Sequence, residues 1–208
     1  MNQDLAAVLV VAGAYLIGSV SFAVVMSRLF ALPDPHTYGS KNPGATNVLR
    51  TGNKAAAVLT LAGDAGKGFV AVLLAKMITG EDIATSLVVP LAGLAAFVGH
   101  LFPVFHRFLG GKGVATAAGV LLGYDFWLGI GTLATWLIIA VFFRISSFAA
   151  LVAAVFAPVF AFWLFGVRPV MWTTIPIALL LMVRHRANIE RLIAGTEPRI
   201  GAKKKAAA

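Results

Sequence analysis

The chain has 208 residues, of which 60% are hydrophobic and 12% are charged, and its net charge is +9. This composition excludes a soluble globular domain of this length and indicates a polytopic, all-α membrane protein. Cysteine is absent, which excludes a disulfide framework, thiolate chemistry and a cysteine-based metal site.

A transmembrane helix needs about 20 apolar residues, and on that basis we expect seven spans. The first apolar segment lacks a basic start and a small-residue cleavage site, so we expect it to be retained rather than removed as a signal peptide. The fourth segment is short and rich in glycine, and a six-span alternative merges it with the fifth. The expected spans are 5–29, 55–78, 84–105, 113–125, 126–143, 147–166 and 169–184.

Lysine and arginine indicate the orientation, because short cytoplasmic loops retain them. With seven spans and the N-terminus outside, 14 of the 17 basic residues fall on the cytoplasmic face. We therefore expect one membrane domain over residues 1–200, with the C-terminus in the cytoplasm. Residues 201–208, which include Lys203 to Lys205, are predicted to form a disordered basic tail attracted to anionic lipid headgroups. No nucleic-acid-binding module is indicated.

The loop after the first span reads GSKNPGATNVLR over residues 39–50 and has no apolar period. It combines short hydrogen-bonding side chains with glycines that permit tight turns, and Arg50 offers a guanidinium matched to phosphate. This composition favours a loop that folds over a polar ligand, although a solvated connector uses the same turn chemistry. The candidate ligand-binding residues are Ser40, Asn42, Gly44, Thr46, Asn47 and Arg50.

The loop after the third span reads GHLFPVFHRFLGGKGVAT over residues 99–116. It is not a nucleotide P-loop, because the required first glycine is replaced by His106 and Gly113 follows Lys112 in place of serine or threonine. Glycines let the backbone approach an anion, and a lysine and a helix N-terminus both favour negative charge. A tight turn between membrane helices is the alternative. The candidate residues are Gly110, Gly111, Lys112, Gly113 and Thr116.

A third polar segment, RHRANIERLIAGTE, begins as the last span ends and covers residues 184–197. On a helix His185, Asn188 and Arg191 share one face, while apolar residues occupy the other. The alternative is a surface helix that pairs with lipid phosphates. All three segments are expected on one side of the membrane. Together they offer cations, amides, hydroxyls and imidazole without a carboxylate cluster, which favours a phosphate-containing ligand over a divalent metal.

In order and spacing, these three segments resemble the cytoplasmic motifs of the bacterial acyl-phosphate:glycerol-3-phosphate acyltransferase (PlsY) family, over nearly the whole chain. The resemblance implies that a fatty acyl group passes from acyl phosphate to the sn-1 hydroxyl of glycerol 3-phosphate, giving lysophosphatidic acid and inorganic phosphate for phospholipid synthesis. It also implies seven helices in the bacterial inner membrane, an active site on the cytoplasmic face, and no cofactor or metal.

The resemblance places Ser40, Arg50, Lys112, His185 and Asn188 at the reaction centre. In this hypothesis Arg50 and Lys112 stabilise charge that develops on the acyl phosphate. The glycine N–H groups hold the leaving phosphate, and hydroxyl and amide side chains position glycerol 3-phosphate. Further substrate-binding residues are expected at Asn42, Gly44, Thr46, Asn47, Gly110, Gly111, Gly113, Thr116 and Arg191.

The residue that accepts the hydroxyl proton stays open at this point. His185 is the residue of the third motif able to act as a general base near neutral pH. A substrate phosphate is an equal alternative, because acyl phosphate is already activated and proximity of the two substrates can suffice. A covalent intermediate on Ser40 is a third alternative, but no base is visible beside this serine in the sequence.

The second hypothesis is a transporter for a phosphorylated metabolite. Asp64 and Lys67, three residues apart in the second span, are predicted to form a neutralising pair, which in a transporter could mark a pathway. Transporters of this kind contain repeated halves with broken helices near the midplane. The chain has no internal repeat, and its polar segments lie at one interface. Asp64 and Lys67 are therefore expected to brace or extend the anion site.

Overall fold

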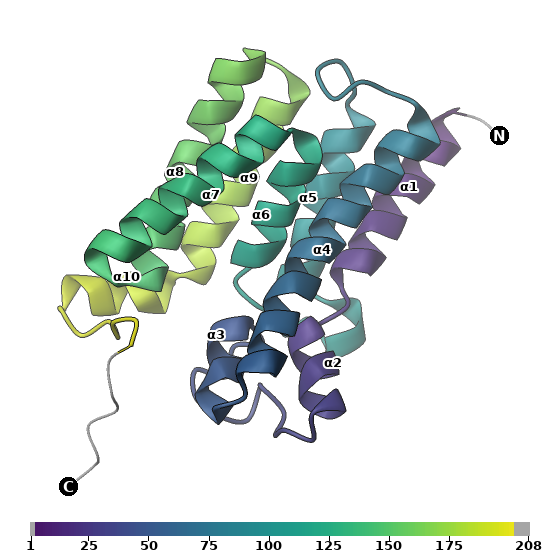
Figure 1. Ribbon diagram of the computed structural model, residues 1–208. Coiled ribbons are helices and arrows are strands. Elements are labelled where there is room, and N and C mark those ends of the chain that lie inside the picture. The colour runs from purple at the N-terminus through teal and green to yellow at the C-terminus, as the bar shows by residue number, and fades with distance from the viewer. Residues whose placement is uncertain (1–2, 202–208) are drawn as a thin grey trace, which may run out of the picture.

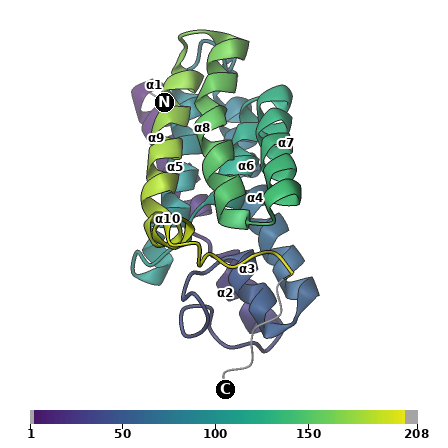
Figure 2. The same cartoon turned by 90° about the vertical axis from the view of Figure 1, so that its left-hand side faces the viewer.

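The computed structural model describes residues 3–201, and its regular structure over that range is helical throughout, as predicted. The long helices form one bundle, with α2, α3 and α10 gathered at one end and the start of α1 at the other (Figures 1 and 2). Residues 202–208 of the predicted basic tail lie outside the described residues. The helices are α1 (Gln3–Gly18), α2 (Phe22–Leu29), α3 (Ala45–Val48), α4 (Lys54–Thr79), α5 (Val88–Leu101), α6 (Val114–Tyr124), α7 (Phe126–Phe143), α8 (Ser146–Phe165), α9 (Pro169–Arg184) and α10 (Arg186–Ile193), with 3₁₀ turns η1 (Leu49–Thr51) and η2 (Val104–His106).

Helix length distinguishes four complete candidate spans from the other apolar helices. Helices α4, α7 and α8, together with the segment Val88–His106, are long and apolar enough to cross a membrane. The bent pair of α1 and α2 makes a fifth candidate. Helices α6 and α9 are apolar but contain 11 and 16 residues. All seven expected segments therefore appear as helices, whereas four or five of them have the length and composition of a full span.

The expected first span, residues 5–29, is not one continuous helix but the bent pair of α1 and α2. Helix α1 ends at Gly18 and α2 begins at Phe22, with a bend of 42° between them. The Ser19 hydroxyl donates to the Tyr15 carbonyl at 2.9 Å, a local bond that competes with helical pairing. This interruption, called the α1–α2 break below, leaves the Val20 carbonyl available to a side chain from another helix.

Small residues let α4 and α6 pack backbone against backbone. A Cβ atom on Gly119 would lie 1.8 Å from the Ala65 carbonyl oxygen, and one on Gly68 would lie 2.5 Å from the Thr116 carbonyl oxygen. Close contact between small residues is the usual way in which membrane helices associate, because lipid removes the hydrophobic driving force between them. The packing brings the charged stretch of α4 beside the start of α6.

Candidate active site

The glycine loop, residues 110–113, connects η2 to α6, and its glycines are required by their surroundings. Gly113 has φ +83°, and a Cβ atom there would lie 2.3 Å from the Phe97 ring. A Cβ atom on Gly111 would lie 2.2 Å from His100 Nε2 and 2.9 Å from the Pro43 carbonyl oxygen. The Gly111 N–H donates to the His100 carbonyl at 3.2 Å. In this conformation the Gly111 N–H therefore donates to the protein backbone rather than facing a phosphate, the role expected for it.

Arg184, the last residue of α9, holds the other side of the glycine loop. Its Nε donates to the Gly111 carbonyl at 3.0 Å and its Nη2 to the Gly110 carbonyl at 2.6 Å. The guanidinium carbon also lies 5.8 Å from the centroid of the Phe102 ring. The sequence indicated a basic residue at this helix end but not its contact with the loop, which is 73 residues away along the chain.

Lys112 projects from the glycine loop to the third motif. Its Nζ donates to Asn188 Oδ1, and Asn188 Nδ2 donates to Glu197 Oε1 at 2.5 Å. Arg191 Nε lies 2.6 Å from Glu197 Oε2, and the Ser147 hydroxyl donates to Oε1 at 2.7 Å. The structure thus brings the predicted residues Lys112, Asn188 and Arg191 together, and Glu197 connects them.

Glu197 was absent from the predicted site, although it ends the third motif. Helix α10 stops before Gly195, whose φ of +68° turns the chain back. The Ile200 N–H then donates to the Arg144 carbonyl at 2.6 Å, which fixes the returning segment at the α7–α8 turn. Burial raises the pKa of Glu197, but hydrogen bonds from Ser147, Asn188 and Arg191 outweigh it and hold this pKa below its usual value.

The electrostatic environment of Lys112 combines burial with other cations. Burial lowers the pKa of Lys112 to about 8, Glu197 opposes the shift, and Arg191, Arg184 and Arg50 add to it. Arg50 is exposed yet close enough to act on this ammonium. Positive charge therefore exceeds negative charge around Lys112 at neutral pH, which suits an anionic ligand.

His185 joins α9 to α10 and has 2% of its surface exposed. Its Nδ1 lies 2.8 Å from the Leu181 carbonyl oxygen. A carbonyl can only accept, so Nδ1 carries the ring hydrogen and Nε2 is the free acceptor. Burial lowers the pKa of His185 to about 4, the Leu181 carbonyl opposes this shift, and Lys112 adds to it. Such a low pKa does not match the expected general base acting near neutral pH.

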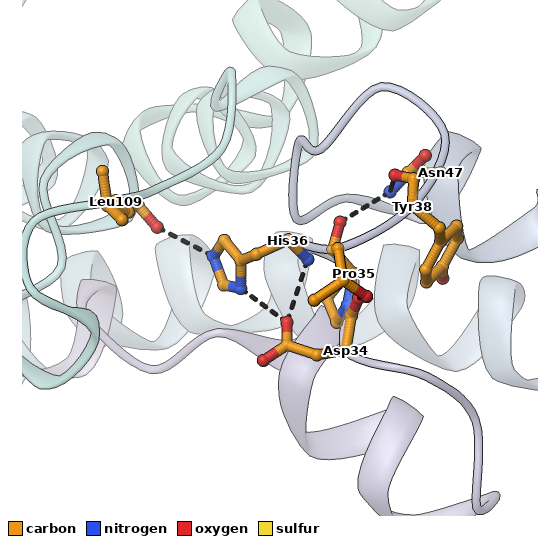
Figure 3. A network of polar contacts seen from close by, with 7 residues as sticks. Asp34, Pro35, His36, Tyr38, Asn47 and Leu109 are labelled. Atoms are coloured by element: carbon orange, nitrogen blue, oxygen red, sulfur yellow. Dashed lines mark hydrogen bonds and ion pairs between the residues drawn. The ribbon is translucent and has the colours of Figure 1, made fainter.

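Asn47 organises the first motif from inside. Its Oδ1 accepts from the Ser40 N–H at 3.0 Å. Its Nδ2 donates to the Tyr38 carbonyl at 3.2 Å and to the Pro35 carbonyl at 2.9 Å, the latter contact being drawn in Figure 3. The side chain is buried, with 1% of its surface exposed. In this structure the amide expected to position substrate therefore shapes the loop. Ser40, Thr46 and Arg50 are exposed, and Asn42 and Gly44 are half-buried.

His36, just before the first motif, connects this part of the chain to the segment before the glycine loop. His36 Nδ1 lies 2.7 Å from Asp34 Oδ1, and its Nε2 lies 3.1 Å from the Leu109 carbonyl oxygen (Figure 3). No sequence pattern predicts this contact, because 73 positions separate His36 from Leu109. Together with the proximity of Pro43 to Gly111, this contact places the first two motifs side by side.

Two further observations complete the placement of the predicted residues. Thr116 is fully buried in the first turn of α6, and its hydroxyl has no hydrogen-bond partner among residues 3–201. Within the same described range, no group of three or more histidine, aspartate or glutamate side chains is arranged to hold a metal ion.

Comparison with known proteins gives one consistent family. The sequence model of a family described as "Glycerol-3-phosphate acyltransferase" matches residues 8–195. A glycerol-3-phosphate acyltransferase of Ralstonia nicotianae is 61% identical over 209 residues, covering 99% of each chain. One from Cupriavidus taiwanensis is 64% identical over 192 residues, covering 92% of this chain and 95% of the relative.

Solved structures show the same architecture. The crystal structure of PlsY, an integral membrane glycerol 3-phosphate acyltransferase, in its glycerol 3-phosphate form matches with a TM-score of 0.87 and 39% identity. The match covers 94% of this chain and 96% of the other. The lysophosphatidic acid form matches with a TM-score of 0.85 and 39% identity, covering 94% and 95%.

Proposed function

Because the chain belongs to the glycerol-3-phosphate acyltransferase family, we propose that it transfers a fatty acyl group from acyl phosphate to the sn-1 hydroxyl of glycerol 3-phosphate. The products are lysophosphatidic acid and inorganic phosphate. The observation that carries this proposal is the cationic site in which Lys112 of the second motif contacts Asn188 of the third. The glycerol 3-phosphate and lysophosphatidic acid forms of the solved relative support the acceptor and the product.

The proposed topology has seven membrane crossings, with the N-terminus outside and the C-terminus in the cytoplasm of a bacterium. The distribution of basic residues supports this orientation. The start of α1 and the helix α10 lie at opposite ends of the bundle, which fits an odd number of crossings (Figure 1). Helix α6 has 11 residues and is about 16 Å long. We propose that α6 crosses only part of the hydrocarbon and that the glycine loop forms the cytoplasmic end of this crossing.

Two phosphate groups must be bound close together in this reaction. Lys112 and Arg50 are proposed to hold the phosphate of the donor and to stabilise the negative charge that grows as it leaves. Arg191 and the exposed Ser40 and Thr46 are proposed to bind glycerol 3-phosphate. The acyl chain would lie among the apolar helices, and the acceptor hydroxyl would then meet an already activated carbonyl group.

The low pKa of His185 supports a substrate phosphate as the proton acceptor. This pKa is about 4, whereas the second pKa of a phosphate monoester is about 6. A substrate phosphate is therefore the stronger base. In the proposed step the hydroxyl oxygen attacks the acyl carbon, the bond from that carbon to the phosphate oxygen breaks, and the proton passes to a phosphate oxygen.

The test uses the purified protein in lipid nanodiscs with glycerol 3-phosphate and palmitoyl phosphate, palmitoyl-CoA or no donor. Released phosphate and lysophosphatidic acid are measured together. We expect equal amounts of both products with palmitoyl phosphate alone. Product formation from palmitoyl-CoA at a comparable rate would disprove the acyl-phosphate donor, and no product with either donor in folded protein would disprove acyl transfer.

A further inference from the structure

A cluster of charged side chains lies inside the bundle next to the glycine loop. Asp64 and Lys67 belong to α4 and His100 to α5, and their side chains are 3%, 3% and 7% exposed. Lys67 Nζ lies 2.9 Å from Asp64 Oδ1, which confirms the predicted pair, and 2.9 Å from His100 Nδ1. Charged groups within membrane helices are costly and usually serve a function. The proposed reaction assigns none to this sealed cluster, defined as Asp64, Lys67 and His100.

Lys67 connects the sealed cluster to the α1–α2 break. Its Nζ donates to the Val20 carbonyl at 2.6 Å. No backbone N–H among residues 3–201 donates to this carbonyl, because the helix is interrupted there. A polar group without a partner is costly in a membrane interior. The ammonium therefore stabilises the break and holds it against α4.

His100 connects the sealed cluster to the glycine loop. Its carbonyl accepts from the Gly111 N–H at 3.2 Å, and its ring lies so close that a Cβ atom on Gly111 would be 2.2 Å from Nε2. Because the Lys67 ammonium can only donate, His100 Nδ1 accepts and the ring hydrogen is on Nε2, which faces Gly111. Lys67, His100, Gly110 and Gly111 border the same narrow space beside the α1–α2 break.

We propose that Asp64, Lys67 and His100 are positioning residues that hold the glycine loop in the conformation in which Lys112 reaches Asn188. Asp64 keeps the Lys67 ammonium in place. Lys67 orients the imidazole, and His100 fixes Gly111 through both its ring and its carbonyl. The kinetic consequence rests on the proposed acyl transfer, since only then does the position of Lys112 affect turnover.

The first test measures hydrogen exchange and needs no substrate. The double variant Asp64→Asn/Lys67→Met removes both charges without leaving one unpaired. Lys76→Met is the matched control, because Lys76 is on the same helix and donates to the Tyr124 carbonyl at 2.9 Å, at the other end of α6. We expect amides of residues 108–113 to exchange about tenfold faster in the double variant and at the wild-type rate in Lys76→Met. An unchanged rate in the double variant overturns the proposal.

The second test uses steady-state kinetics in a double-mutant cycle. We expect Asp64→Asn/Lys67→Met to raise KM for acyl phosphate about tenfold with a smaller change in kcat. Lys76→Met should change neither constant. If the sealed cluster acts through the loop, Gly111→Ala and Asp64→Asn/Lys67→Met impair the same contact. The protein that carries all three substitutions should then lose no more kcat/KM than the more impaired of these two variants. Effects that multiply would show independent action and overturn the proposal.

If the double variant does not fold, a single substitution at His100 tests the same proposal. His100→Leu removes the contact with Lys67 and Gly111 but leaves the Asp64–Lys67 pair intact, and it should give the same exchange and kinetic changes. If wild-type protein transfers no acyl group from any donor, the proposed function fails. The exchange experiment still decides whether the sealed cluster positions the loop.

Discussion

Two charged clusters flank the glycine loop and differ in their balance of charge. In the sealed cluster, one ammonium meets one carboxylate and an imidazole that accepts from it. The open cluster is defined as Lys112, Asn188, Arg191 and Glu197, and in it two cations share one carboxylate while Arg184 and Arg50 add positive charge. A cluster inside the membrane must be neutralised by the protein itself. The open cluster keeps excess positive charge for a ligand.

The largest expected effect comes from removing the central cation of the open cluster. Lys112→Ala should lower kcat/KM about a thousandfold, because it deletes a charge that stabilises the leaving phosphate. The assay is phosphate and lysophosphatidic acid release in nanodiscs. Lys54→Ala, an exposed lysine at the start of α4, is the control and should retain wild-type kcat/KM. Retention of a tenth or more of the activity in Lys112→Ala would contradict the assignment.

Substitutions in the sealed cluster should lower the stability of the protein. Lys67→Met leaves Asp64 buried without its partner, which should lower the free energy of unfolding by about 3–5 kcal/mol. Asp64→Asn/Lys67→Met leaves no charge and should be less destabilised. Denaturant-induced unfolding in detergent compares the three proteins. If the single variant is as stable as the double variant, the carboxylate does not depend on Lys67.

His185 tests whether the protein or the substrate removes the proton. In His185→Asn, the amide can still donate to the Leu181 carbonyl, but the free acceptor Nε2 is lost. We expect kcat to fall less than about tenfold, because general-base catalysis contributes about 10²–10⁴-fold and is assigned to a substrate phosphate. A loss of about a thousandfold in a folded variant would make His185 the base.

The smallest effect should be a shift in pH dependence. The free enzyme needs Lys112 protonated, so kcat/KM should fall as pH rises through its pKa of about 8. Glu197 raises this pKa and Arg191 lowers it. Glu197→Gln should therefore move the alkaline limb to lower pH, and Arg191→Gln should move it to higher pH. If both variants shift the alkaline fall of kcat/KM in the same direction, the titration of Lys112 does not cause that fall.

Several features of the fold followed from local patterns. Apolar length located the seven helical segments, and the Asp64–Lys67 spacing predicted their ion pair correctly. Apolar length did not predict the α1–α2 break, because this break depends on a partner far away in the chain. The first span was expected as one segment, but it is interrupted at the α1–α2 break, where Lys67 donates to the Val20 carbonyl from 47 residues away. Hydropathy does not register such a contact.

The site divides in the same way. The three motifs identified Lys112, Asn188 and Arg191, which the structure brings together. The amide of Asn47 was expected to bind substrate, yet it is enclosed by its own loop. Glu197 and Arg184 were missed as structural partners, since Glu197 accepts from Ser147 and Arg184 donates to the Gly110 carbonyl, contacts that span 50 and 74 residues of the chain.

The sequence by itself determined the membrane-embedded helical class, the cationic character of the three motifs and the family to which they belong. These properties are sums over residues or local spacings, so they can be read without a fold. The tertiary structure alone decided that the Lys67 ammonium is neutralised by Asp64, whereas the cations around Lys112 exceed the nearby negative charge and remain available to an anionic ligand. That decision depends on distances between atoms far apart in the chain, because charge interactions and burial act through space rather than along the sequence.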